Sequence, residues 1–241
     1  MTDTMTARLA ELVAEAAHER QRPDATSYRS LSFQSQKRIA EAAGVGQKGV
    51  QLVALQQGII PEVYVRNQKS LSNDDQVRLL QSRVAVIGLG GLGGTVTEIL
   101  ARIGIGSLTL VDGDRFDDSN LNRQLLSSTA VLGNEKALVA EERVAEVNPA
   151  VETRAVVSFL DEENGDELLV GADIVVDCLD SITTRFTLEQ ACRRIGLPLV
   201  SAAIGGTSGQ VTVIYPDDQG LSRIYGDPER VDHRGVEKSL G

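Results

Sequence analysis

From Arg83 onward, the sequence alternates between short runs rich in β-forming residues and segments long enough to be helices. The β-rich runs are residues 84–88, 107–112, 152–157, 173–180, 197–204 and 210–216, and segments with helical spacing include 95–104, 136–148 and 181–196. Such alternation predicts a doubly wound α/β fold with a mostly parallel sheet. The composition agrees: hydrophobic residues make up 41% of the chain and aromatic residues only 3%, which favours a sheet buried on both faces by aliphatic side chains.

The segment before Arg83 has a different pattern, with apolar residues at helical spacing over residues 5–20. A polar break follows at residues 21–30. Residues 32–61 then predict two short helices with a turn at Gly44 and Gly46. A pair of helices with a glycine turn is also typical of DNA-reading motifs, which remains the alternative interpretation. A small helical arm is favoured, because the second helix, QKGVQLVALQQ, offers a single cation.

Charge and cysteine usage exclude several classes of protein. The net charge of −10 argues against a nucleic-acid-binding surface, because phosphate backbones require clustered Lys and Arg. Cys178 and Cys192 do not form a C-x-x-C pair, so a disulfide scaffold and a four-cysteine zinc site are not expected. No apolar run approaches the length of about 20 residues needed to span a bilayer. The N-terminus lacks the apolar core of a signal peptide, and we therefore expect a cytoplasmic protein without membrane or nucleic-acid partners.

A glycine-rich turn follows the first predicted strand of the sheet, in RVAVIGLGGLGGTV. Gly88, Gly90 and Gly93 match G-x-G-x-x-G, with Gly91 as an extra glycine. Glycines allow a tight turn and close approach of the backbone to phosphate, and the following helix N-terminus favours negative charge. Asp112 ends the next strand, where a carboxylate can bind ribose hydroxyls. These features predict a Rossmann-like nucleotide site but fit NAD or FAD as well as ATP, and no P-loop sequence is present.

The residues after Asp112 favour a triphosphate. DGDRFDDSNLNRQ places Arg123 close behind the ribose carboxylate, and Lys136 lies at the start of a predicted helix. A dinucleotide needs little positive charge there, whereas a triphosphate has additional charge to neutralise. Asp180 lies at the carboxyl end of a later strand, where doubly wound sheets bind ligands, and it can hold Mg²⁺ against phosphate oxygens.

A series of motifs in this order resembles the ThiF/MoeB/HesA adenylating enzymes, which are bacterial relatives of ubiquitin-activating enzymes. The motifs are GLGGLG, VDGD, SNLNRQ, GNEKA, the NP of EVNPAV, DCLDS and PLVSAAIGGTSGQVTV, and the similarity covers about residues 60 to 215. The resemblance implies an adenylation domain over residues 63–241, preceded by the helical arm over residues 1–62. It also implies ATP-dependent adenylation of the C-terminal glycine of a small ubiquitin-like sulfur carrier, in thiamine, molybdopterin or related sulfur metabolism.

The resemblance assigns roles to individual residues. It implies catalytic roles for Arg66, Arg123, Lys136 and Asp180, with Mg²⁺ on Asp180 and no zinc. The implied nucleotide-binding set is Gly88, Gly90, Gly91, Asp112, Ser119, Asn120, Leu121, Asn122, Arg123, Lys136, Asp180 and Ser181. Arg66 lies in VYVRNQ, which is similar to the family segment whose arginine reaches the partner subunit's ATP site. The resemblance therefore implies a homodimer.

Two departures from the family keep alternatives open. Ser181 stands where the family usually has Asn. The chain also ends at Gly241, so the C-terminal part of the family fold is expected to be missing. One alternative is a non-catalytic module that binds nucleotide or carrier, and a weaker one is an NAD-dependent oxidoreductase, based on the glycine motif and Asp112 alone. Arg185 has two interpretations, as a residue that orients Asp180 or as part of a helix surface.

Overall fold

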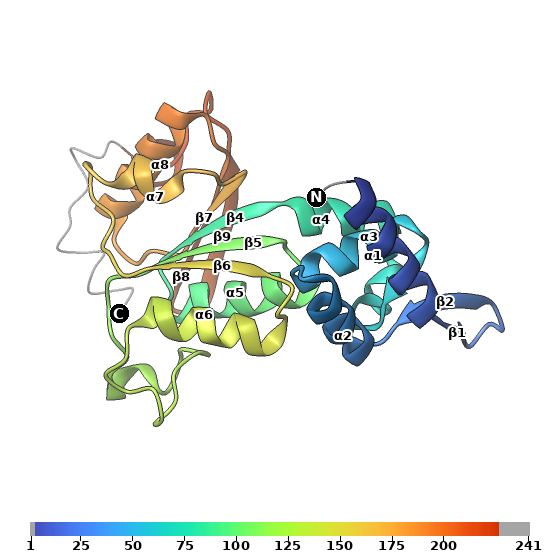
Figure 1. Cartoon of the computed structure of the whole chain (residues 1–241). Coiled ribbons are helices and arrows are strands. Elements are labelled where there is room, and N and C mark those ends of the chain that lie inside the picture. The colour runs from blue at the N-terminus through green and yellow to red at the C-terminus, as the bar shows by residue number, and fades with distance from the viewer. Residues whose placement is uncertain (1–2, 227–241) are drawn as a thin grey trace. The chain divides into compact units, whose positions relative to one another are not determined.

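The computed structural model describes residues 3–226 (Figure 1). This part of the chain divides into two compact units. The first unit contains the chain up to Ser82 together with Leu100–Ser107 and Asn148–Glu152. The second contains Arg83–Ile99, Leu108–Val147 and the chain from Thr153 onward. No helix in residues 3–226 combines the length and the apolar character required to cross a membrane.

The first unit consists of helices and a small sheet. The helices are α1 (Asp3–Ala16), α2 (Phe33–Ala43), α3 (Gln47–Gln56) and α4 (Asn73–Gln81), with short 3₁₀ turns η1 (Glu62–Tyr64) and η2 (Asn67–Lys69). Ser32 caps the start of α2 through its hydroxyl, and Gly44 ends that helix with a φ of 64°. The predicted helix pair and its glycine turn are therefore confirmed.

The polar break in the first unit contains two strands that the sequence pattern did not predict. The strands β1 (His18–Gln21) and β2 (Ser27–Leu31) form an antiparallel hairpin, and β2 also pairs in parallel with β3 (Ile59–Pro61). The four residues of β1 are all exposed, so they carry no apolar alternation that would indicate a strand. Backbone pairing to the rest of the unit, rather than local pattern, determines this hairpin.

A buried chain of polar side chains runs through the first unit. The Tyr64 hydroxyl donates to Gln51 Oε1 at 3.0 Å and accepts from Asn148 Nδ2 at 2.9 Å. Gln51 Nε2 donates in turn to Gln36 Oε1 at 2.9 Å, and Asn148 Nδ2 also donates to the Ala101 carbonyl at 2.9 Å. Burial raises the pKa of Tyr64 to about 12, so the hydroxyl stays protonated and serves as donor and acceptor.

We expect Tyr64→Phe to lower the free energy of unfolding by about 1–3 kcal/mol, because Gln51 Oε1 would be left buried without its donor. The measurement is urea unfolding followed by circular dichroism. Tyr215→Phe is the matched control, since the Tyr215 side chain is 61% exposed. Equal stability of the two variants would contradict a structural role for the buried hydroxyl.

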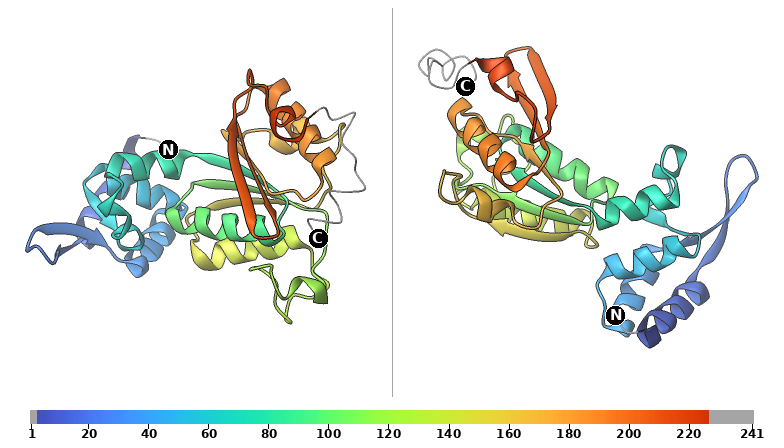
Figure 2. Two further views of the ribbon diagram at one scale, coloured as in Figure 1. Left: turned by 180° about the vertical axis from the view of Figure 1, so that it is seen from behind. Right: turned by 90° about the horizontal axis from the view of Figure 1, so that it is seen from above.

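The second unit is built on a six-stranded sheet. Its strands are β4 (Arg83–Ile87), β5 (Ser107–Val111), β6 (Glu152–Val156), β7 (Ile174–Asp177), β8 (Leu199–Gly205) and β9 (Ser208–Ile214). Their order is β6-β5-β4-β7-β8-β9. The strand β7 pairs in parallel with both β4 and β8, and β8 pairs with β9 antiparallel at one edge of the sheet (Figure 2). The predicted mostly parallel, doubly wound sheet is confirmed.

Helices cover both faces of this sheet. The helices α5 (Gly91–Ile103) and α6 (Lys136–Val147) lie on one face, and α7 (Gly165–Leu169) and α8 (Ile182–Ile195) lie on the other (Figure 1). A short helix, α9 (Ser222–Tyr225), follows β9. The α8 face is a mostly aliphatic core in which Phe186 and Leu188 pack with Ile87, Val175 and Leu199. The scarcity of aromatic residues thus corresponds to a core of Val, Ile, Leu and Ala.

The strand order reverses between β4 and β7. The chain leaves β4 toward β5 on one side, and β7 pairs on the other side. In doubly wound sheets, loops that leave two neighbouring strands in opposite directions open a crevice at the carboxyl ends of those strands. The fold therefore positions a binding site beside the residues that directly follow β4 and β7.

Candidate nucleotide-binding site

A cavity of about 650 Å³ lies in the second unit, next to the carboxyl ends of β4, β5 and β7. Its volume lies within the range typical of small-molecule sites. The structure brings seven of the predicted residues together in its walls: Gly88, Gly90, Gly91, Asp112, Arg123, Lys136 and Asp180. These residues lie on the connections that follow three different strands, β4, β5 and β7, so their meeting is a property of the fold.

The glycine turn connects β4 to α5 with almost no spare space. Gly88 has a φ of +88°, and a Cβ there would lie 2.8 Å from the carbonyl oxygen of Cys178. A Cβ on Gly93 would overlap the carbonyl oxygen of Gly88. The first glycine thus lets the turn approach the loop after β7, and the third lets α5 pack against the turn. The free N–H groups of the first turn of α5 remain available for phosphate oxygens.

Asp112 ties the glycine turn to the end of β5. Its carboxylate accepts hydrogen bonds from the backbone N–H of Leu89 at 2.7 Å and from that of Asp114 at 2.8 Å. The two bonds use different oxygens, and each carboxylate oxygen has a further lone pair. Asp112 therefore shapes the turn and can still accept a hydrogen bond from a ribose hydroxyl.

Two cations line the cavity from the connection between β5 and α6. Lys136 is the first residue of α6; its side chain is 8% exposed, and its Nζ lies 3.1 Å from Asp114 Oδ2. Arg123 donates from Nη1 to the Ser119 carbonyl at 2.6 Å, which braces its guanidinium against its own loop. Both groups retain N–H donors beyond these contacts, and their binding to phosphate stays a prediction.

Five of the predicted nucleotide-binding residues lie outside the cavity walls: Ser119, Asn120, Leu121, Asn122 and Ser181. Ser119 and Asn120 lie in the short turn η3 (Asp118–Asn120), where both form hydrogen bonds with Asp117. Ser181 caps the start of α8. In this structure these side chains shape the loops that present Arg123 and Asp180, and a direct nucleotide contact remains a prediction.

Asp180 lies in the cavity wall and is exposed. Its carboxylate makes no hydrogen bond or ion pair with any residue that the structure describes. No group of three or more acidic, His or Cys side chains suited to a metal ion occurs in residues 3–226. Mg²⁺ in nucleotide sites is commonly held by one or two carboxylates plus phosphate oxygens, so a single free carboxylate fits such an ion.

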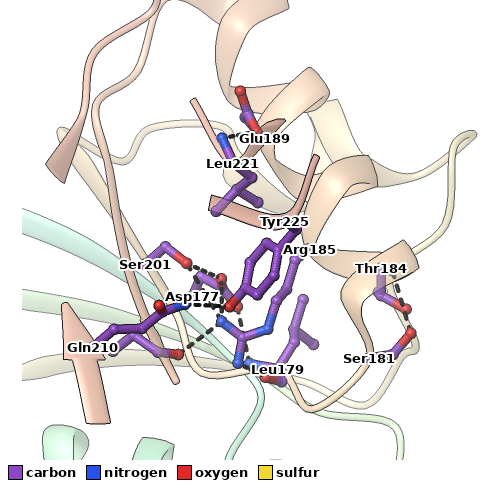
Figure 3. A network of polar contacts seen from close by, with 11 residues as sticks. Asp177, Leu179, Ser181, Thr184, Arg185, Glu189, Ser201, Gln210, Leu221 and Tyr225 are labelled. Atoms are coloured by element: carbon purple, nitrogen blue, oxygen red, sulfur yellow. Dashed lines mark hydrogen bonds and ion pairs between the residues drawn. The ribbon is translucent and has the colours of Figure 1, made fainter. Parts of the chain in front are cut away.

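A buried ion pair holds the loop that carries Asp180, and sequence reasoning missed it (Figure 3). Asp177, at the end of β7, is fully buried, and its Oδ2 accepts from Arg185 Nη1 at 3.0 Å and from Ser201 Oγ at 2.6 Å. Its Oδ1 accepts from the Leu179 N–H at 3.0 Å, while Arg185 Nη2 donates to the Leu179 carbonyl. Both backbone polar groups of Leu179, the residue before Asp180, are therefore held by hydrogen bonds.

This network gives Arg185 a role that neither of its two interpretations named. Arg185 is 4% exposed, pairs with Asp177 rather than Asp180, and also donates to the Ala202 carbonyl at 2.7 Å. Burial raises the pKa of Asp177, and the neighbouring guanidinium opposes that rise. The signal in the sequence was an acid inside the apolar run DIVVDCLD, because a buried carboxylate requires a partner.

The remaining polar groups of the site also have identifiable environments. Gln124 lines the cavity, is 8% exposed, and its Oε1 has no hydrogen-bond partner. Cys178 lines the same cavity, but burial raises the pKa of its thiol to about 12, so it is a poor nucleophile. Arg66 lies in the first unit between η1 and η2 and is exposed.

The doubly wound sheet, the glycine turn and the convergent cations define a nucleotide-binding α/β protein. Comparison with protein families narrows this class: the ThiF family model matches residues 64–238, and the chain belongs to the ThiF family. The matched region covers 53% and 64% of the length of the two curated relatives described next.

Two of these relatives are adenylating or activating enzymes by name. The SAMP-activating enzyme E1 of Haloferax volcanii is 42% identical over 144 residues, which cover 60% of this chain and 53% of that protein. The sulfur carrier protein ThiS adenylyltransferase of Escherichia coli is 38% identical over 162 residues, covering 65% and 64%.

Solved structures show the same fold. E. coli tRNA N6-threonylcarbamoyladenosine dehydratase, TcdA, in complex with ATP, matches with a TM-score of 0.57 and 32% identity over 63% of this chain and 62% of that one. PaaA matches with a TM-score of 0.60 over 85% of this chain and 78% of that one. Its identity is 21%, so this similarity concerns the fold alone.

Proposed function

We propose that this protein is an adenylyltransferase that uses ATP and Mg²⁺ to activate the C-terminal glycine carboxylate of a small ubiquitin-like sulfur carrier. The observation that carries the proposal is the convergence of Arg123, Lys136 and Asp180 on one cavity with the glycine turn. Membership of the ThiF family and the names of the adenylyltransferase relatives support it. In this proposal residues 63–241 form the adenylation domain and residues 1–62 an appended arm.

The chemistry of the site suits this reaction. A C-terminal carboxylate is ionised at neutral pH and attacks the α-phosphate without a general base or an enzyme nucleophile. The barrier lies in bringing two anions together and releasing pyrophosphate. Arg123 and Lys136 would neutralise phosphate charge and orient the triphosphate. Mg²⁺ held by Asp180 would withdraw charge from the phosphate oxygens.

The similarity to TcdA suggests tRNA as a second class of substrate, because the name of that enzyme includes a modified tRNA nucleoside. We favour the carrier protein, because the net charge of −10 disfavours association with a polyanion. The match to the ThiF family argues against the oxidoreductase alternative.

The decisive experiment is exchange of labelled pyrophosphate into ATP in the presence of a carrier ending in Gly-Gly. The control carrier lacks the two terminal glycines, and a further arm replaces carrier with tRNA. We expect exchange only with the intact carrier. ATP binding by calorimetry without exchange in any arm would favour a non-catalytic binding module, and exchange with tRNA alone would transfer the proposal to that substrate.

We also propose a homodimer in which Arg66 acts on the triphosphate of the partner subunit. An arginine supplied in trans is an established way to stabilise phosphoryl charge. Arg66→Ala and Asp180→Ala chains should each be inactive, whereas mixed chains should regain exchange through one intact composite site. A monomeric protein, or mixing without recovery although subunits exchange, would contradict the in-trans role.

A further inference from the structure

Phe159 is an aromatic side chain left open at the wall of the nucleotide cavity. It lies in the segment after β6, and it is 66% exposed although the chain contains few aromatic residues. Burying an aromatic ring is strongly favourable, so a ring exposed inside a cavity indicates a surface that a ligand can cover.

The ring is held in place by a glycine on the neighbouring strand end. A Cβ on Gly113 would lie 2.6–2.8 Å from ring atoms of Phe159, so the ring packs directly on the Gly113 backbone. Gly113 immediately follows Asp112, whose N–H donates to the Val156 carbonyl at 3.2 Å and joins the ends of β5 and β6. The ring therefore packs on the residue that directly follows Asp112, whose carboxylate is predicted to bind ribose.

The backbone that carries the ring is also fixed. Asn164 Nδ2 donates to the Phe159 carbonyl at 2.8 Å, and Asn164 Oδ1 accepts from the Asp161 N–H at 3.0 Å. Ser158 and Leu160 line the same part of the cavity. The aromatic surface is thus presented by a braced loop, which limits the entropy lost when a ligand binds.

We propose that Phe159 is the base-binding residue of this site and that its ring packs against the adenine of the nucleotide. The proposal rests on the nucleotide-binding function proposed above. Stacking of a base on an aromatic side chain is sequence-tolerant and substantial, because every base has a π-face. In this proposal the glycine turn, the two cations and Asp180 bind the phosphates, whereas Phe159 offers an apolar contact beside Asp112, the predicted ribose ligand.

The test compares ligands that do and do not contain a base. We expect Phe159→Ala to weaken binding of both AMP and ATP about ten-fold in calorimetry, while binding of inorganic tripolyphosphate stays unchanged. Phe159→Trp should retain affinity. Val170→Ala is the matched control, because Val170 is 69% exposed and does not line the cavity.

A second variant keeps the ring but moves it. Gly113→Ala introduces a Cβ where the ring now lies, so it should weaken AMP binding in the wild-type background and have much less effect in the Phe159→Ala background. Equal AMP affinity of wild type and Phe159→Ala, or an equal loss of tripolyphosphate binding, would overturn the base-binding role alone. A wild-type chain that binds no adenine nucleotide would overturn the proposed function as well.

Discussion

Asp180→Asn is expected to lower carrier-dependent exchange of pyrophosphate into ATP about 100- to 1000-fold. A bound metal ion stabilises the charge of a transition state by several kcal/mol, and losing that stabilisation slows the reaction by such a factor. The substitution keeps the shape of the side chain and removes the charge proposed to hold Mg²⁺. Exchange of labelled pyrophosphate is the measurement, with saturating Gly-Gly carrier and varied Mg²⁺.

Two comparisons separate a metal-holding role from a general defect. Glu163→Gln removes an exposed carboxylate outside the cavity walls and should leave exchange unchanged. AMP binding should also survive in Asp180→Asn, because the base and ribose contacts do not involve this residue. Wild-type exchange in Asp180→Asn, at every Mg²⁺ concentration, would remove Asp180 from the proposed mechanism.

Arg185→Ala is expected to have the second large effect, a loss of about 3–5 kcal/mol in the free energy of unfolding. Asp177 is fully buried, and this substitution would leave its carboxylate without the paired guanidinium. The Leu179 carbonyl would also lose its donor, so the loop carrying Asp180 would be less well held. Urea unfolding measures the loss of stability. Pyrophosphate exchange by the folded fraction shows whether the loop still holds Asp180 in a working position.

The pH dependence of this loss has a definite sign. Burial raises the pKa of Asp177, and without Arg185 that rise is less opposed. A carboxyl whose folded pKa lies above its unfolded value destabilises the fold most when it is charged, so the deficit should shrink as pH falls from neutral toward the ordinary pKa of a carboxyl group. The double variant Asp177→Leu with Arg185→Met leaves no unpaired charge and should be more stable than Arg185→Ala. A double variant no more stable than the single one would contradict this account.

The central architecture was predictable because its causes are local. Alternation of β-rich and helical segments is visible in the order of residues, and it predicts the doubly wound sheet whichever strands become neighbours. The glycines and Asp112 were predictable for a similar reason. A turn that must approach a phosphate permits few residue types, and the carboxylate follows at the end of the next strand.

Contacts between distant segments escaped this reasoning. The exposed strand β1 shows no apolar alternation, and its partner β2 pairs in parallel with β3, a strand that lies beyond α2 and α3 in the chain. Residues Ser119–Asn122 were grouped with Arg123 by their position in one motif. The turn η3 directs them into their own loop, and only Arg123 reaches the cavity wall.

The sequence alone therefore determined the fold class, the glycine turn, and the cations and carboxylates suited to a nucleotide, because each depends on a short run of residues. Only the tertiary structure decided that Arg185 pairs with Asp177 rather than Asp180, and that Phe159 packs on Gly113 at the cavity wall. Both contacts join separate loops at the carboxyl ends of the sheet. Their partners are set by strand order and close packing, which act across the chain rather than along it.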